Sequence, residues 1–355
     1  MKEVMSNIDI RLVLPELKEA AEGSFIKNVY QYGDIFVLKL YQPAGGTSQL
    51  LIQPGQRVHL TEYRRSAPRV PPRFCTVLRK YLRDRKVISV RQHDLDRILV
   101  IEIGDDDSTY KIVAELFGNG NLLLLDPDDA IFIAKRYRKM RDRNIVPKAT
   151  YVFPPPRGTD IFSLDTDAFQ KLISDSSESL VRTLASRLNL DSLSCEEICA
   201  LAGLKPAKKV PELATQELKD LQGGLDLFAE KLKGGAVKPC LVLDDDIDPE
   251  EEPQPLAFLP FQFEVYNGHD IQSFDSFSKA IDSFFGVSEV ELVDEEAKDA
   301  FDKERKRLET IIERQSESIS KLEDKAANLR AAGEAIYSHF QTVQEILNTI
   351  SDARS

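Results

Sequence analysis

The sequence predicts an α+β protein, because three different patterns follow one another along the chain. Short, closely spaced strand patterns fill residues 1–160, a helical pattern rich in leucine and glutamate fills residues 161–235, and a 4-3 repeat of apolar residues follows residue 291. With 355 residues, of which 42% are hydrophobic, the chain can bury more than one core. We therefore expect a β-rich domain, a helical domain and a long helix.

The β-rich part is expected to begin with a helix over residues 6–22, where apolar residues recur at roughly helical spacing before a stop at Gly23. Pro15 lies inside this helix and should kink or reposition it. Gly118-Asn119-Gly120 tolerates positive φ and predicts a hairpin turn. A second helix is expected over 72–86, and strands over 34–41, 48–54, 56–63, 97–103, 110–117, 120–126 and 130–137. Such closely spaced strands favour an antiparallel sandwich or a barrel-like sheet.

A proline-rich segment over 152–160 predicts an extended connector and a domain boundary. Residues 161–235 then predict a small helical domain. Residues 236–290 return to strand patterns and form a second part of the β-rich region, which a helix near 275–285 closes. The acidic run over 244–253 is typical of a solvated loop.

Residues 291–355 predict one long helix with an apolar seam, typical of a coiled-coil arm. Gln315 and Gly333 are the exceptions in the repeat. The seam positions are Leu308, Ile312, Ile319, Leu322, Ala326, Leu329, Ile336, Phe340, Val343, Leu347 and Ile350. Because the repeat is still running at Ser355 and no returning helix follows, we expect a truncated arm that pairs with the arm of a second chain.

Basic residues gather in two clusters, although the net charge of the chain is -12. Between Arg57 and Arg97, twelve basic and four acidic residues leave a local charge of +8, and a second cluster spans residues 135–148. A basic face on a folded domain implies a polyanion, most simply RNA, and arginine suits bidentate phosphate contacts; an ordinary solvated helix is the alternative. The candidate RNA-binding residues are Arg64, Arg65, Arg73, Arg79, Lys80, Arg83, Lys86, Arg136, Arg138, Lys139 and Arg141.

The cysteines and histidines predict no metal centre. The four cysteines form no CxxC pair, and the spacing of Cys195 and Cys199 is poor for a metal, so buried free thiols in a reducing compartment are expected. The N-terminus lacks the apolar stretch of a signal peptide, and no run of 18 apolar residues exists. We expect a cytoplasmic protein with no membrane span and no cofactor.

An acid–base pair, Asp96-Arg97, stands at the start of the buried strand pattern over 97–103. A strand entrance needs no such pair for folding. The pair therefore either closes the turn as an ion pair or contacts a ligand. Asp9 poses a similar choice, because Ser6-x-x-Asp9 fits a capping box in which Asp9 only closes its own helix.

Several segments resemble the NFACT family of ribosome-associated quality-control tailing factors, called RqcH or NEMF in different lineages and formerly fibronectin-binding protein A-like. These segments are NIDIRLVLPELKE (7–19), LTEYRRSAPRVPPRFCTVLRKYLRDRKV (60–87), QHDLDRILVIEI (92–103), AELFGNGNLLLLD (114–126), FDSFSKAIDSFF (274–285) and LRAAGEAIYSHFQTVQEIL (329–347). They agree with the family in order, so the resemblance runs through nearly the whole chain.

The resemblance implies an NFACT-N domain similar to the N-terminal domain of formamidopyrimidine-DNA glycosylases, then a helix-hairpin-helix-type domain, then the first arm of a long antiparallel coiled coil. The family's RNA-binding NFACT-R domain would lie beyond this chain. Family members bind the large ribosomal subunit that still carries peptidyl-tRNA. They recruit aminoacyl-tRNA, typically alanyl-tRNA, for template-free C-terminal tailing of the stalled chain, and the ribosome itself forms the bond, so no enzyme is implied.

The resemblance also implies that Asp9, Asp96 and Arg97 act in recruiting tRNA. A guanidinium at Arg97 can pair with a phosphate or a base edge. The two aspartates can orient it, or accept hydrogen bonds from ribose or base donors.

Other classes of function remain to be weighed against this one. A general RNA- or tRNA-binding protein without tailing activity is the main alternative. A glycosylase-like enzyme would need an N-terminal proline amine, but the chain begins Met1-Lys2-Glu3. An adhesin is disfavoured because the N-terminus is typical of a cytosolic protein and the cysteines are unpaired. Lys205 also stands where a helix-hairpin-helix motif would place a second glycine, which departs from a strong DNA-binding hairpin.

Overall fold

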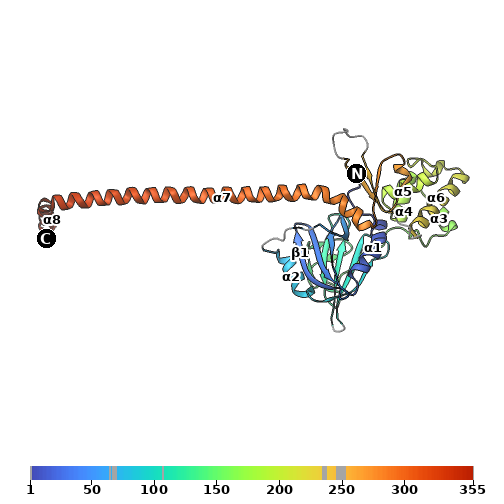
Figure 1. Cartoon of the computed structure of the whole chain (residues 1–355), viewed down its shortest axis with the longest axis horizontal. Coiled ribbons are helices and arrows are strands. Elements are labelled where there is room, and N and C mark those ends of the chain that lie inside the picture. The colour runs from blue at the N-terminus through green and yellow to red at the C-terminus, as the bar shows by residue number, and fades with distance from the viewer. Residues whose placement is uncertain are drawn as a thin grey trace. The chain divides into compact units, whose positions relative to one another are not determined.

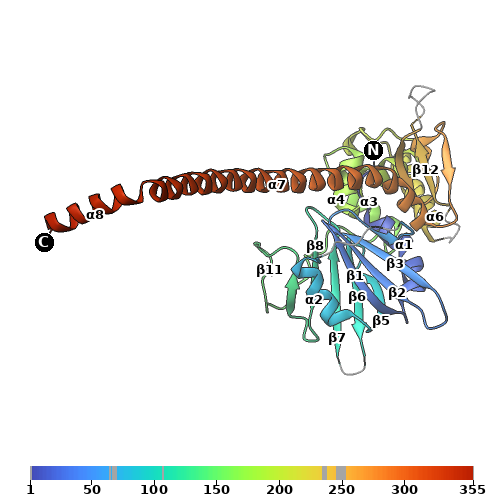
Figure 2. The same cartoon turned by 60° about the vertical axis from the view of Figure 1, so that its left-hand side comes forward.

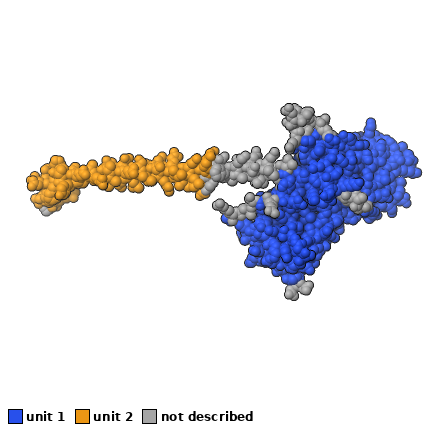
Figure 3. Space-filling model, in the orientation of Figure 1, with its two compact units in different colours: residues 1–287 blue, residues 288–355 orange. Residues whose placement is uncertain are grey.

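The computed structural model of the chain describes residues 2–63, 65, 70–105, 108–233, 238–244 and 253–354, without the side chains of residues 287–304. The chain divides into two compact units, residues 1–287 and residues 288–355 (Figure 3). The first unit holds the sheets and the shorter helices, and the second unit is helical.

A large antiparallel sheet dominates the first unit (Figure 1). Within the described residues its strand order is β4-β3-β2-β1-β5-β6-β7-β8-β9. The strands are β1 (Phe25–Tyr32), β2 (Ile35–Tyr41), β3 (Thr47–Gln53), β4 (Arg57–Leu60), β5 (Lys86–Gln92), β6 (Ile98–Gly104), β7 (Thr109–Glu115), β8 (Asn121–Leu125) and β9 (Ile131–Ala134). The order describes two meanders, β1 to β4 and β5 to β9, that meet where Phe25 pairs with Lys86. This confirms the antiparallel sheet that the sequence predicts.

The expected strands leave out β1 and β5, the two strands at which the meanders meet. The predicted hairpin after β7 is confirmed, since β7 and β8 pair from Glu115 with Asn121 onward. Gly120 has φ +61°, and a Cβ atom there would lie 2.0 Å from the backbone nitrogen of Gly55. The turn needs glycine at this position both for its backbone conformation and for its close approach to the β3–β4 turn.

Helix α1 (Asn7–Ala21) and helix α2 (Arg73–Leu82) pack on the sheet, and Figure 2 shows α2 beside β1. Helix α1 continues through Pro15 as one helix, so the expected kink does not divide it. The prediction of a helix over 72–86 was wrong at its end. Arg83 is extended and Asp84 has φ +60°, which turns the chain from α2 into β5.

A second, smaller sheet lies between two hydrophobic cores. Its strands, in the order β13-β12-β14, are β12 (Cys240–Leu243), β13 (Pro255–Leu259) and β14 (Ile271–Ser273). Leu241 and Phe258 belong to the core of the large sheet, whereas Val242 and Leu259 belong to the core of the helical layer. Because strand side chains alternate between faces, β12 and β13 contribute to both cores of the unit.

The helical layer consists of α3 (Thr166–Ser174), α4 (Leu180–Leu188), α5 (Ser192–Leu201), a 3-10 turn η1 (Val210–Glu212) and α6 (Thr215–Lys233). A second 3-10 turn, η2 (Glu264–Tyr266), precedes β14, and a short hairpin of β10 (Arg138–Lys139) and β11 (Asn144–Ile145) follows β9. All four cysteines are buried free thiols. Most of the acidic run over 244–253 lies outside the described residues.

The second unit contains most of α7 (Phe277–Ser338) and all of α8 (Phe340–Arg354). The prediction of a single helix through the apolar repeat was wrong at His339, where one helix ends and the next begins. The hydroxyl of Ser338 donates a hydrogen bond to the carbonyl oxygen of Ala335 at 3.1 Å. Such bonds compete with the helical backbone and often bend a helix, which gives a local reason for the break.

Candidate nucleic-acid interface

Asp96 and Arg97 lie in the turn that joins β5 to β6. The backbone N–H of His93 donates to Ile98 O at 2.9 Å, and Asp94 adopts φ +47°. The Asp96 carboxylate accepts a hydrogen bond from the backbone N–H of Arg97 at 2.7 Å. Within the described part of the chain no ion pair joins the Asp96 and Arg97 side chains. The turn is therefore closed by backbone contacts, and the guanidinium is not needed to close it.

Two asparagines hold this turn against distant parts of the chain. The Asn7 side chain donates to Leu95 O at 3.0 Å and to Asn189 O at 2.7 Å. The Asn189 side chain donates to the same Leu95 carbonyl at 3.0 Å. Asn189 ends α4 in a left-handed conformation that asparagine tolerates, and Gln92 adds bonds to Asn7 O and Asp96 O. The start of α1, the turn and the α4–α5 link are thereby joined into one framework.

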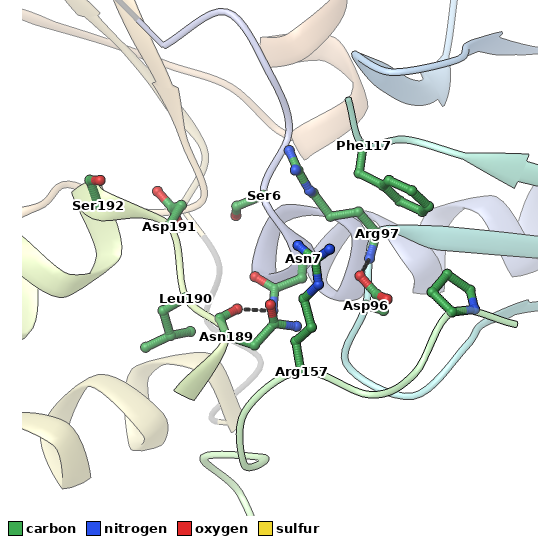
Figure 4. Close-up of a pocket in the computed structure, with 11 residues that line it drawn as sticks. Ser6, Asn7, Asp96, Arg97, Phe117, Arg157, Asn189, Leu190, Asp191 and Ser192 are labelled. Carbon is green, nitrogen blue, oxygen red and sulfur yellow. Dashed lines mark hydrogen bonds between the residues drawn. The ribbon is translucent and has the colours of Figure 1, made fainter. Parts of the chain in front are cut away.

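A pocket of about 330 Å³ opens within this framework (Figure 4). It lies between the β5–β6 turn, the start of α1, the proline-rich connector and the α4–α5 link. Phe117 and Leu190 contribute apolar surface to it. Its polar lining residues are Ser6, Asn7, Asp96, Arg97, Arg157, Asn189, Asp191 and Ser192. A second pocket of about 160 Å³ shares Asp96, Pro154, Arg157 and Asn189 with the first, so the two are neighbours.

Two guanidinium groups reach into the pocket, Arg97 from the turn and Arg157 from the connector (Figure 4). Neither guanidinium has a hydrogen bond or ion pair with the described residues. Burial lowers the pKa of Arg97, and nearby Arg157 lowers it further, while Asp96 and Asp191 act in the opposite direction. A partly buried cation without a close partner is costly, so this pocket is suited to an anionic or hydrogen-bond-accepting ligand.

The Asp191 carboxylate in the same pocket is already engaged. Asp191 is the N-cap of α5, and its carboxylate accepts from Ser194 Oγ at 2.6 Å and from Ser194 N at 3.4 Å. It therefore fixes one wall of the pocket and leaves the arginines as the cationic contacts.

Asp9 lies outside the pocket lining, next to Ser6 and Asn7 on α1. The capping box is confirmed: Asp9 N donates to Ser6 Oγ at 3.1 Å, and Ser6 N donates to the Asp9 carboxylate at 2.7 Å. Asp9 is buried, and Lys2 Nζ lies 2.8 Å from it. Burial raises the pKa of Asp9 and outweighs the opposite effect of Lys2. The carboxylate holds the start of α1 in place, and its role toward tRNA remains a prediction.

The predicted basic residues differ in their exposure to solvent and in whether they already have partners within the protein. Arg79 donates from Nε to Val29 O at 2.6 Å, and Arg136 pairs with Asp34 at 2.6 Å. Arg65 is half-buried, and burial lowers its pKa. Arg64 lies outside the described residues. The exposed members are Arg73, Lys80, Arg83, Lys86, Arg138, Lys139 and Arg141.

The predicted helix over 72–86 would place Arg79, Lys80, Arg83 and Lys86 on one face. This prediction was wrong, because α2 ends at Leu82 and Lys86 begins β5. No sequence pattern selects Asn7, Arg157 or Asn189 as pocket residues. A weak signal exists for Asn189, because asparagine is favoured in the left-handed position that ends a helix. Arg157 follows three prolines, a stiff segment that can present a side chain, but its partners lie far away in the sequence.

The described residues contain no group of three or more His, Cys, Asp or Glu side chains arranged to hold a metal ion. Nor, in the part of the chain that the structure describes, is any helix long and apolar enough to span a bilayer.

The chain belongs to the NFACT family: the family described as NFACT N-terminal and middle domains matches residues 6–355. This confirms the resemblance. The archaeal Rqc2 homolog aRqcH of Methanocaldococcus jannaschii is 32% identical over 366 residues, which cover 100% of this chain and 53% of that relative. The human ribosome quality control complex subunit NEMF is 25% identical over 374 residues, covering 99% of this chain and 34% of NEMF. The chain thus spans about half or less of these relatives.

Solved structures agree with the fold. The N-terminal part of the fibronectin/fibrinogen-binding protein from Streptococcus suis has a TM-score of 0.61 at 20% identity, covering 79% of this chain and 99% of that chain. The fibrinogen binding protein from Staphylococcus aureus has a TM-score of 0.63 at 19% identity, covering 79% of this chain and 98% of that chain. At these identities the likeness concerns the fold alone.

Proposed function

We propose that this chain acts in ribosome-associated quality control in the cytoplasm. It binds the large ribosomal subunit obstructed by peptidyl-tRNA and recruits an aminoacyl-tRNA, with alanyl-tRNA as the expected substrate. The stalled nascent chain is then extended at its C-terminus without a template. Membership of the NFACT family, with relatives named Rqc2 homolog and ribosome quality control complex subunit, supports this proposal.

The observation that carries the proposal at the level of residues is the pocket around Arg97. Its two guanidiniums, Arg97 and Arg157, have no close partner among the described residues and suit phosphate or base acceptors. Asp96 keeps the Arg97 backbone in place through a 2.7 Å hydrogen bond. Asp9 and Asn7 position α1 at the edge of the pocket. In this proposal the protein binds and orients tRNA, and the ribosome forms the peptide bond, so the protein itself is no enzyme.

A matched pair of variants tests the proposal. Large subunits carrying peptidyl-tRNA are sedimented with the chain, and the tRNA retained is quantified. We expect Arg97→Ala to sediment with the subunits but to retain little tRNA. Arg91→Ala, an exposed arginine on the same hairpin, should behave like the unaltered chain. Failure of the unaltered chain to sediment with the subunits would contradict the ribosomal role.

The second candidate is a general RNA- or tRNA-binding protein without a role in tailing. The exposed basic residues of the large-sheet region favour it, because they suit any polyanion. The two candidates differ in selectivity: a general binder would retain total tRNA in proportion to its abundance, whether or not a large subunit is present.

A further inference from the structure

A groove on the large-sheet region combines aromatic and basic side chains away from the Arg97 pocket. Its volume is about 610 Å³, within the range of about 300–1,000 Å³ typical of ligand sites. It lies between α2 and the chain from β9 toward β10. The lining residues that carry the inference are Arg73, Phe74, Lys80, Tyr81, Phe132 and Tyr137.

The aromatic rings of this groove form a fixed platform. The Tyr81 ring has its centroid 4.4 Å from that of Phe132 and 5.5 Å from that of Tyr110. Phe132 is 39% exposed and Tyr137 is 48% exposed. The Tyr137 hydroxyl accepts a hydrogen bond from Ala134 N at 3.4 Å, which holds the ring near β9. Two large aromatic side chains are therefore presented to solvent next to a packed cluster.

Cations border the same rings. Lys80 Nζ lies 5.4 Å from the centroid of Tyr81, and Arg73 is exposed at the start of α2. Immediately after Tyr137, the exposed side chains of Arg138, Lys139 and Arg141 follow, and one exposed acid, Asp142, comes next. Lys135 also lines the groove but is paired with Asp34. A basic rim on a chain of net charge -12 selects an anionic ligand over an apolar peptide.

We propose that this groove binds an unpaired segment of RNA, with bases stacking on Phe132 and Tyr137 and phosphates contacting Arg73, Lys80 and the β10–β11 hairpin. Aromatic platforms inside a basic groove bind single strands because every base offers a flat face, whereas in a duplex those faces are covered. The proposal deepens the proposed nucleic-acid role and rests on it, but it concerns a second site. If the groove binds a protein segment and not RNA, this proposal is wrong.

The test is fluorescence anisotropy of a labelled oligouridine, about 12 nucleotides long, and of an RNA duplex of equal length, using the 355-residue chain. The double variant Phe132→Leu/Tyr137→Leu keeps an apolar side chain at each position and leaves the charge unchanged, but it removes both rings. We expect it to bind oligouridine about fivefold or more weakly, with only a small fall in melting temperature from the lost Tyr81–Phe132 ring contact. Tyr137→Phe keeps the ring and loses only the long 3.4 Å bond from Ala134 N, so it should bind far more tightly than the double leucine variant.

A matched control lies elsewhere on the sheet. Tyr41 is 38% exposed, and Lys27 Nζ lies 5.2 Å from its ring, so Tyr41→Leu removes a similar cation–aromatic pair outside the groove. It should leave oligouridine binding unchanged. The proposal is overturned if the double leucine variant binds like the unaltered chain, if the duplex binds as tightly as the single strand, or if only a polyglutamate peptide depends on the two rings.

Arg97→Ala separates this proposal from the proposed function. We expect that variant to bind oligouridine normally even where it loses tRNA on the large subunit. Loss of oligouridine binding in Arg97→Ala would place the single strand in the Arg97 pocket and overturn the second site. Normal tRNA retention by Arg97→Ala would contradict the role of the pocket and leave the groove result standing.

Discussion

The guanidinium of Arg97 is partly buried, and no carboxylate of the described residues lies within the 4.0 Å that defines an ion pair. Its backbone is held on both sides, because Arg97 N donates to Asp96 and Arg97 O accepts from Leu116 N at 2.8 Å. The backbone is thus fixed, whereas the side chain makes no hydrogen bond or ion pair with the described residues. Arg97 is therefore not part of a structural ion pair there, and its contact with a ligand stays a prediction.

The first prediction concerns Arg97→Ala. Because the guanidinium makes no hydrogen bond to the described residues, the free energy of unfolding should change by no more than about 0.5 kcal/mol. Binding of tRNA should fall at least about tenfold, as expected for removal of a charged hydrogen-bond donor. Thermal melting and tRNA titration on the same preparation measure both quantities. A loss of stability large enough to explain the weaker binding would contradict the prediction.

The second prediction concerns Asp9, whose contacts are those of a helix cap. Asp9→Ala removes the capping-box bond that the Asp9 carboxylate accepts from Ser6 N, and it removes the ion-pair partner of Lys2, so the chain should lose about 0.5–2 kcal/mol of stability. Asp9→Asn keeps a capping acceptor and should lose less. Chemical denaturation compares the two. If Asp9→Ala abolishes tRNA retention with an unchanged melting temperature, Asp9 acts on the ligand directly.

The framework around the pocket could not be predicted from the sequence. Asn7 and Asn189 are 182 positions apart, and Asn7 and Leu95 are 88 apart, so their hydrogen bonds depend on how three elements assemble. Asp96 and Arg97 are predicted by the family resemblance and by their place before a strand. The sequence does not predict whether the Asp96 and Arg97 side chains form an ion pair, because that depends on the path of the β5–β6 turn.

Local patterns predict local elements. Gly118 and Gly120 predict the hairpin after β7, and the Ser6–Asp9 capping box predicts the start of α1. Strands β1 and β5 were missed because polar residues such as Asn28, Gln31 and Arg91 interrupt their apolar runs. Their place in the middle of the sheet comes from pairing with distant strands, which no local pattern reports.

The third prediction concerns the β10–β11 hairpin and its salt dependence. Changing Arg138, Lys139 and Arg141 to glutamate should weaken RNA binding and make the plot of log affinity against log salt less steep. The slope should change by about 0.7–0.9 for each phosphate that the hairpin no longer neutralises. These side chains are exposed, so the melting temperature should stay nearly constant. Equal slopes for the variant and the unaltered chain would show that the hairpin does not contact RNA.

The fourth prediction concerns Asp34, which pairs with both Lys135 and Arg136. These two cations hold the pKa of Asp34 below its usual range. Asp34→Asn should release them toward the aromatic groove and tighten binding of single-stranded RNA by a few fold at low salt. Anisotropy at two salt concentrations checks this. Weaker binding would mean that Asp34 holds the two basic side chains in their binding positions.

At the scale of the whole molecule, the apolar seam of the second unit is open to solvent. Ile312 is 63% exposed, Leu322 65%, Leu329 63% and Phe340 61%. Burial of such a stripe is what normally stabilises a long helix in water. The break at His339 divides the seam, so we propose that pairing of two arms depends mainly on the part in α7.

The fifth prediction is that the 355-residue chain dimerises with concentration through this seam. Leu322→Asp/Leu329→Asp should abolish the dimer, while Leu347→Asp, beyond the break, should weaken it less. Sedimentation velocity over a wide concentration range measures the effect. A monomer at all concentrations, or a dimer that survives deletion of residues 305–355, would contradict it.

The central claim is that the Arg97 pocket retains tRNA on the large ribosomal subunit. The most direct measurement is sequencing of the tRNA that sediments with purified large subunits carrying peptidyl-tRNA, with the unaltered chain, Arg97→Ala and Arg91→Ala in parallel. We predict one enriched species, alanine tRNA, with the unaltered chain and Arg91→Ala, and its loss with Arg97→Ala. Recovery of the same enriched tRNA with Arg97→Ala would contradict the claim.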